Sequence, residues 1–119
     1  MTTSEIANRL VAYCRKAEWE AAQKELYAKN AKSIEPYATP DFEKETNGLQ
    51  GILAKGVKFG TLVEKMHSIE VSEPIVATNS FAFIITMDVT MKGQERMKMP
   101  EICVYLVKDG KIVSEEFFI

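Results

Sequence analysis

The sequence predicts one α+β domain over residues 1–119, in which three N-terminal helices pack on one face of a curved antiparallel sheet. Apolar residues recur at helical spacing in the first third of the chain and again from Leu49 to Met66, and at period two after His67. The dipeptide Asp109-Gly110 adds a hairpin signal, because a tight turn needs positive φ and both residues tolerate it. A sheet that curls around helices can leave a pocket at its open end, where we expect the functional site.

The first predicted helix begins close to the N-terminus. Thr2 and Glu5 have the spacing of a capping box, in which the hydroxyl and the carboxylate satisfy backbone donors at a helix start. The residues that follow form an apolar stripe at i, i+4, i+7 and i+11, namely Ile6, Leu10, Tyr13 and Ala17. This spacing predicts a helix that buries the stripe.

Two further helices are predicted before His67. The segment from Glu18 to Lys29 carries one apolar face made of Trp19, Ala22 and Leu26. Helical spacing stops between Ser33 and Gly48, where two prolines favour a short strand and a loop. It returns from Leu49 to Met66, with apolar positions at Ile52, Phe59, Val63 and Met66.

The rest of the chain is predicted as antiparallel strands joined by short polar turns. The strands are Ser68 to Ala77, Phe81 to Met91, Arg96 to Val107 and Lys111 to Ile119. Successive side chains of a strand point to opposite faces, so residues two apart share a face. Apolar residues of opposite parity, Ile84, Ile102, Val104 and Leu106, indicate that the outer face of the central strands is also covered.

Composition limits the classes of partner. The formal net charge is -2, and charges of both signs are interspersed, so the chain lacks the basic surface that binds a phosphate backbone and no nucleic acid is expected. No stretch approaches the roughly 18 apolar residues of a membrane span, and we expect a cytoplasmic protein that does not associate with membranes. Cys14 and Cys103 lack CxxC spacing and are expected to be free, buried thiols.

Two local motifs resemble the nuclear transport factor 2-like superfamily, which includes SnoaL-like polyketide cyclases and ketosteroid isomerases. The run Trp19-Glu20-Ala21-Ala22 through Leu26-Tyr27-Ala28 to Ser33-Ile34-Glu35-Pro36 is similar to the second helix and first strand of that superfamily. The run Val107-Lys108-Asp109-Gly110-Lys111-Ile112-Val113, followed by Glu115-Glu116-Phe117-Phe118, is similar to its final hairpin. The resemblance spans nearly the whole chain and implies a SnoaL-like domain, with a cone-like, cystatin-like fold around an internal pocket.

The resemblance to ketosteroid isomerases implies a base at Glu35. This residue precedes Pro36, where those enzymes carry their proton-abstracting carboxylate, and an apolar pocket can raise the pKa of a carboxyl group towards neutrality. Alternatively, Glu35 caps a loop or pairs with a lysine at the surface. The oxyanion hole of the isomerases is not matched, because Cys103 occupies the position of the acid and Leu10 that of the tyrosine. Steroid isomerisation is therefore not expected.

The resemblance to SnoaL-like cyclases implies an acidic residue in the pocket that acts as acid and base. Glu101 shares strand parity with Cys103 and Tyr105, and we favour it over Asp88, which lies opposite a large apolar set. His67, the only histidine, could serve as a general base or as a donor to a ligand; the alternative is a structural histidine.

The predicted pocket lining is mostly aromatic and consists of Tyr13, Trp19, Tyr37, Phe59, Phe83, Cys103 and Tyr105. With several methionines beside it, such a lining suits a flat hydrophobic molecule. We expect no metal site, because the chain has one histidine and no acidic cluster at ligand spacing, and we expect no cofactor. Members of the superfamily pack the outer sheet face on a second subunit, so the resemblance implies a homodimer through the sheet.

Two functions are compatible with this sequence. The first is a small cofactor-independent enzyme of the cyclase or isomerase type, with Glu35 or Glu101 as acid and base. The second is a non-catalytic dimeric module that binds a ligand or associates with a protein. Fold alone does not choose between them, because one fold hosts many functions.

Overall fold

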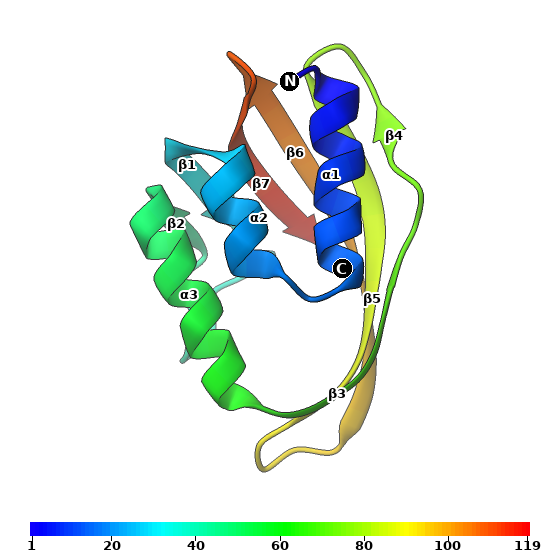
Figure 1. Cartoon of the computed structure of the whole chain (residues 1–119). Helices are drawn as coiled ribbons and strands as arrows, with labels where there is room; N and C mark the ends of the chain where they lie inside the picture. The colour runs from blue at the N-terminus through cyan, green and yellow to red at the C-terminus, as the bar shows by residue number, and fades with distance from the viewer.

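The structure, a computed structural model, describes all residues from Met1 to Ile119. Three helices lie on one face of a strongly curved sheet (Figure 1). They are α1 (Thr3–Arg15), α2 (Trp19–Leu26) and α3 (Leu49–Leu62). The strands are β1 (Tyr27–Ile34), β2 (Glu45–Asn47), β3 (Val63–Val71), β4 (Ile75–Val76), β5 (Ser80–Met91), β6 (Arg96–Lys108) and β7 (Lys111–Phe118). The predicted α+β class with three helices is confirmed.

The start of α1 is fixed by the predicted capping box. The Thr2 hydroxyl accepts a hydrogen bond from the Glu5 backbone N–H at 3.1 Å, and the Glu5 carboxylate accepts one from the Thr2 N–H at 2.9 Å. Both bonds satisfy donors that a helix N-terminus leaves unpaired. The capping prediction is confirmed at the level of individual atoms.

All three helices end earlier than the apolar spacing predicts. The first ends at Arg15, and Ala17 lies in a turn with φ of 56° rather than on the buried stripe. The second ends at Leu26 instead of Lys29, because the chain from Tyr27 enters the sheet beside β7. The third ends at Leu62 instead of Met66, because β-branched Val63 begins a strand that pairs with β5.

The sheet is mixed, whereas the sequence predicts a wholly antiparallel one. Its strand order is β2-β1-β7-β6-β5-β3, with β4 paired to the end of β5. The strands β1 and β7 run parallel, while every other pair is antiparallel. These two strands lie far apart in sequence and are not joined by a hairpin turn, so no local sequence signal predicts their pairing. The β6–β7 hairpin does have the predicted turn, with φ of 51° at Asp109 and 73° at Gly110.

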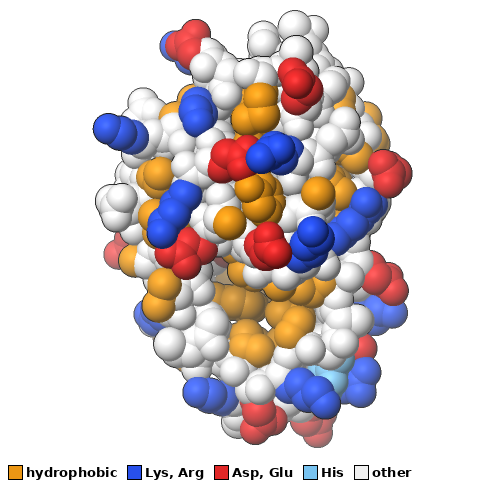
Figure 2. Space-filling model, in the orientation of Figure 1, with side chains coloured by type: hydrophobic (Ala, Val, Ile, Leu, Met, Phe, Trp, Pro, Cys, Tyr) orange, Lys and Arg blue, Asp and Glu red, His pale blue; other side chains and the backbone are white.

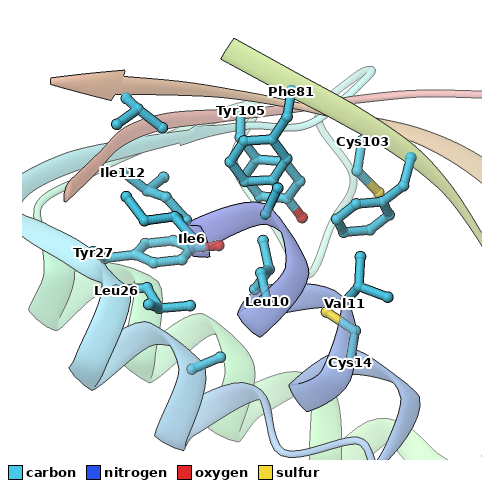
Figure 3. Packing of buried hydrophobic residues seen from close by; sticks show 14 of the residues in the cluster. Ile6, Leu10, Val11, Cys14, Leu26, Tyr27, Phe81, Cys103, Tyr105 and Ile112 are labelled. Atoms are coloured by element: carbon cyan, nitrogen blue, oxygen red, sulfur yellow. The ribbon is translucent and has the colours of Figure 1, made fainter. Parts of the chain in front are cut away.

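One hydrophobic core lies between the concave face of the sheet and the helices (Figure 3). The rings of Phe81 and Tyr105 stack at 4.9 Å between centroids, above the α1 residues Ile6 and Leu10. Cys14 and Cys103 are buried in this core as free thiols, as predicted. Further along β5 and β6, the inward-facing Met87, Met97 and Met99 are only half-buried, so the helices do not fill the inner face of the sheet along its whole length.

Candidate functional site

A cavity of about 620 Å³ opens where α2 and α3 diverge from β6. Figure 2 shows its mouth as a hollow lined by hydrophobic side chains. All three helices, the loop between Glu35 and Phe42, and strands β1, β5, β6 and β7 contribute to the 27 lining residues, of which 17 are hydrophobic. The volume lies within the usual range of small-molecule sites, roughly 300–1,000 Å³.

The structure brings most of the predicted site residues to this cavity. Its lining includes both preferred carboxylates and five of the seven predicted wall residues: Glu35, Glu101, Trp19, Tyr37, Phe59, Cys103 and Tyr105. They come from α2, the loop after β1, α3 and β6. Residues far apart in the sequence therefore meet at one hollow.

Three predicted site residues lie elsewhere. Tyr13 turns toward α2, where its hydroxyl donates a hydrogen bond to the Glu25 carboxylate. Phe83 is buried in the core against Tyr105, with 5.3 Å between ring centroids, and does not reach the cavity. His67 lies at a register irregularity of β3, with Nε2 2.7 Å from the Thr90 hydroxyl, and is also outside the lining.

Asp88, the less favoured carboxylate, also lies outside the cavity. Its carboxylate accepts two hydrogen bonds from the Arg96 guanidinium, at 2.9 and 2.8 Å. This pairing lowers the pKa of Asp88, chiefly through the hydrogen bonds from Arg96. Asp88 is therefore part of a surface ion pair on the face of the sheet opposite the cavity.

Glu101 is a carboxyl group of the cavity whose pKa is raised to near neutrality. It lies on the same face of β6 as Cys103 and Tyr105, as strand parity predicts. Burial, together with the nearby charges of Glu35 and Glu115, raises its pKa from 4.5 to about 7, and the Lys55 ammonium opposes this shift. Glu101 can therefore both hold and release a proton near neutral pH.

Glu115 is a second buried carboxyl group and is not among the site residues predicted from the sequence. It is 4% exposed and lines the cavity from β7. Its two oxygens accept hydrogen bonds from the hydroxyls of Tyr27 and of Ser33, the latter at 2.6 Å. Burial raises the pKa of Glu115, and the hydroxyl donors oppose that shift.

Lys55 supplies the ammonium group inside the cavity. From α3 its Nζ donates a hydrogen bond to the Ser33 hydroxyl at 2.6 Å and lies 3.8 Å from Oε2 of Glu35. A hydrogen-bonded chain thus runs from Lys55 through Ser33 and Glu115 to Tyr27. Helical spacing could have identified Lys55, because it lies three residues after the buried Ile52 and four before Phe59.

Glu35 has an unsatisfied oxygen. Its Oε2 atom is shielded from solvent and forms an ion pair with Lys55 at 3.8 Å, but that distance is too long for a hydrogen bond and the oxygen accepts none. The resemblance to ketosteroid isomerases indicated this residue, and it does border the cavity. A buried carboxylate oxygen without a donor is costly in free energy, which favours a ligand that supplies one.

The thiols of the cavity wall are held in their neutral form. Burial raises the pKa of Cys14 to about 12, and it also raises that of Cys103. A thiolate is the nucleophilic form of cysteine, so neither residue is a good nucleophile near neutral pH. Among His, Cys, Asp and Glu, no three side chains are grouped to hold a metal ion. None of the helices is long and apolar enough to span a bilayer.

Comparison with known proteins places the chain in a family. The family model of the SnoaL-like domain matches residues 1–119. The chain belongs to the SnoaL-like domain family. Among curated proteins, none matches the sequence.

Solved structures extend this result to the three-dimensional fold of this SnoaL-like domain. A candidate SnoaL-like polyketide cyclase from Mesorhizobium loti is 28% identical, with a TM-score of 0.93 and full coverage of both chains. A nuclear transport factor 2-like protein from Burkholderia pseudomallei is 15% identical over all of this chain and 92% of its own, with a TM-score of 0.83. A protein with a ketosteroid isomerase-like fold from Catenulispora acidiphila, solved with trimethylamine, is 14% identical over 99% of this chain and 87% of its own, with a TM-score of 0.75.

Proposed function

We propose that this SnoaL-like domain binds a small, largely apolar molecule in its cavity and transfers a proton to or from it through Glu101, without a cofactor. The observation that carries the proposal is the position of Glu101 in a mostly hydrophobic wall, close enough to two other carboxyl groups to be affected by their charge. Apolar walls with a few convergent polar groups are typical of small-molecule sites.

Proton transfer fits the electrostatics of Glu101. A general acid or base works best when its pKa lies near the working pH, and the pKa of Glu101 is raised to about 7, chiefly by burial. Lys55, the ammonium of the interior, can compensate negative charge that develops on a bound molecule. The full-length similarity to a candidate polyketide cyclase supports the same class of chemistry. A cyclase closes a ring, and that reaction needs a group that removes a proton and returns one.

The proposal is tested by carbon-acid exchange, which does not require the natural substrate. Benzylacetone, a small apolar ketone, is incubated with the protein in deuterium oxide, and deuterium at its α-carbons is followed by NMR. We expect exchange at least tenfold faster than in buffer, rising as Glu101 ionises near pH 7. Glu101→Gln should abolish the acceleration, whereas Glu95→Gln, exposed in the β5–β6 turn, should retain it. Equal rates for the wild type and Glu101→Gln would refute proton transfer by Glu101.

A homodimer through the outer face of the sheet is a second part of the proposal. Ile84, Ile102 and Phe118 lie side by side across β5, β6 and β7, and each is 44–48% exposed. A contiguous exposed apolar row of this kind is typical of a protein interface. Sedimentation should therefore give twice the monomer mass, and Ile102→Lys should give a folded monomer. A monomeric wild type at micromolar concentration would overturn the dimer.

A further inference from the structure

The cavity contains more acidic than basic groups in its interior. Glu35, Glu101 and Glu115 line it, and Lys55 is the one basic side chain directed among them. Lys98 also borders the cavity, but it is exposed and lies across from Asp88 on the other face of the sheet. A bound anion would therefore meet uncompensated negative charge, whereas a cation would reduce it.

The unsatisfied oxygen of Glu35 specifies the chemistry still more closely. Oε2 is solvent-shielded and accepts no hydrogen bond, because the Lys55 ammonium, its ion-pair partner, lies 3.8 Å away and donates to Ser33 at 2.6 Å. A ligand N–H in its charged form would supply the missing donor, and charge-assisted bonds are roughly twice as strong as neutral ones. An alcohol would supply a donor without the charge.

The aromatic residues of the cavity wall are also suited to binding a ligand ammonium group. Ammonium groups already lie against two lining rings, with Lys55 Nζ 5.7 Å from the centroid of Phe117 and Lys58 Nζ 5.3 Å from that of Phe42. Trp19 and Tyr37 line the cavity as well and have no lysine or arginine over their rings. A cation over the face of Trp or Tyr is attracted by the ring quadrupole.

A divalent metal ion does not account for these features. Such an ion needs several oxygen ligands converging within about 2.0–2.6 Å, and no three acidic, histidine or cysteine side chains are grouped in that way. The carboxyl groups instead lie at separate points of a mostly apolar wall. This distribution matches an organic molecule with one charged end.

We propose that the ligand of this cavity is an apolar amine, whose ammonium group is held by the Glu35 carboxylate and by aromatic rings of the wall. This inference rests on the proposed function, because it names the class of molecule that the same cavity takes. The ligand ammonium and Lys55 together supply two positive charges, which balance the negative charges of the Glu35 and Glu115 carboxylates. Glu101 then remains free to exchange its proton.

Three matched probes test the inference: phenylpropylamine, phenylpropanol and phenylpropanoate, which share one apolar body and differ in charge. Trp19 is the only tryptophan of the chain and lines the cavity, so its fluorescence reports occupancy. We expect the amine to bind at least tenfold more tightly than the alcohol, and the carboxylate to bind most weakly. Glu35→Gln should weaken amine binding at least tenfold and alcohol binding by a clearly smaller factor, because the alcohol carries no charge, while Glu95→Gln changes neither.

The outcomes separate this inference from the proposed function. If the alcohol or the carboxylate binds the wild type as tightly as the amine, the ammonium inference is overturned while binding of apolar molecules stands. If none of the three binds to folded protein, both proposals fall. The ranking of the three probes on the wild type decides the matter even if Glu35→Gln does not fold, which circular dichroism would show.

Discussion

Glu101→Gln should make the protein more stable at alkaline pH and change little at acidic pH. The pKa of Glu101 is raised from 4.5 to about 7 in the folded state, so between these values the folded state binds more protons than the unfolded state. The stabilisation linked to this proton is fully present below about pH 4.5 and is lost as pH rises through about 7. At about 1.36 kcal/mol per pKa unit, the loss amounts to roughly 3 kcal/mol. Glutamine, which stays neutral, avoids that loss.

The assay is urea unfolding of both proteins from about pH 4 to pH 8. The variant should unfold with similar free energy at the acidic end and with up to about 3 kcal/mol more at the alkaline end, which corresponds to roughly 10 °C in Tm for a chain of this length. Some slope should persist in the variant, because the pKa of Glu115 is also raised by burial. Glu95→Gln removes the same charge at an exposed site and should reproduce the wild-type curve. Parallel curves for the wild type and Glu101→Gln would refute the reasoning.

Three further predictions concern buried groups around the cavity. Tyr27→Phe removes a hydroxyl donor from buried Glu115 and should lower the free energy of unfolding by about 1–3 kcal/mol in chemical denaturation; an unchanged value would show that the bond contributes nothing. Cys14 and Cys103 should resist iodoacetamide at about pH 8 until the protein is unfolded, because burial raises both pKa values; mass spectrometry of the native protein would reveal any labelling. Leu26→Ala, at a position with 0% exposure, should cost about 2–5 kcal/mol in thermal or urea unfolding, against about 0.5 kcal/mol or less for Val57→Ala at 65% exposure.

The parts of the fold that depend on local signals were predicted, and those that depend on distant pairing were not. The capping box of α1 and the Asp109-Gly110 turn follow from backbone chemistry within a few residues. The ends of α2 and α3 do not follow from local signals, because the residues after each helix pair with strands that are distant in sequence. Helix propensity is a weak preference, which tertiary hydrogen bonding overrides at both junctions.

The same distinction applies to the candidate site. Glu101, Cys103 and Tyr105 were placed on one face because β6 pairs with β5 in an unbroken register from Arg96 to Leu106, so simple alternation holds. The prediction that His67 serves as a base or as a donor to a ligand placed it before the first long strand, whereas it lies within β3 and outside the cavity. Strand alternation could not have corrected this, because the register of β3 shifts between Met66 and Ser68.

Glu115 shows why the most buried acid of the cavity could not be found by alternation. Starting from the buried Ile112, a regular strand would turn Ser114 and Glu116 inward and Glu115 outward. The register of β7 against β6 shifts by one residue between Ile112 and Ser114, so Glu115 instead lies opposite Tyr105 on the concave face. Because the two adjacent glutamates differ only in position, the bulge alone decides which carboxyl group enters the cavity and meets Tyr27 and Ser33. The charge balance that favours an amine ligand therefore depends on one irregularity of the last strand.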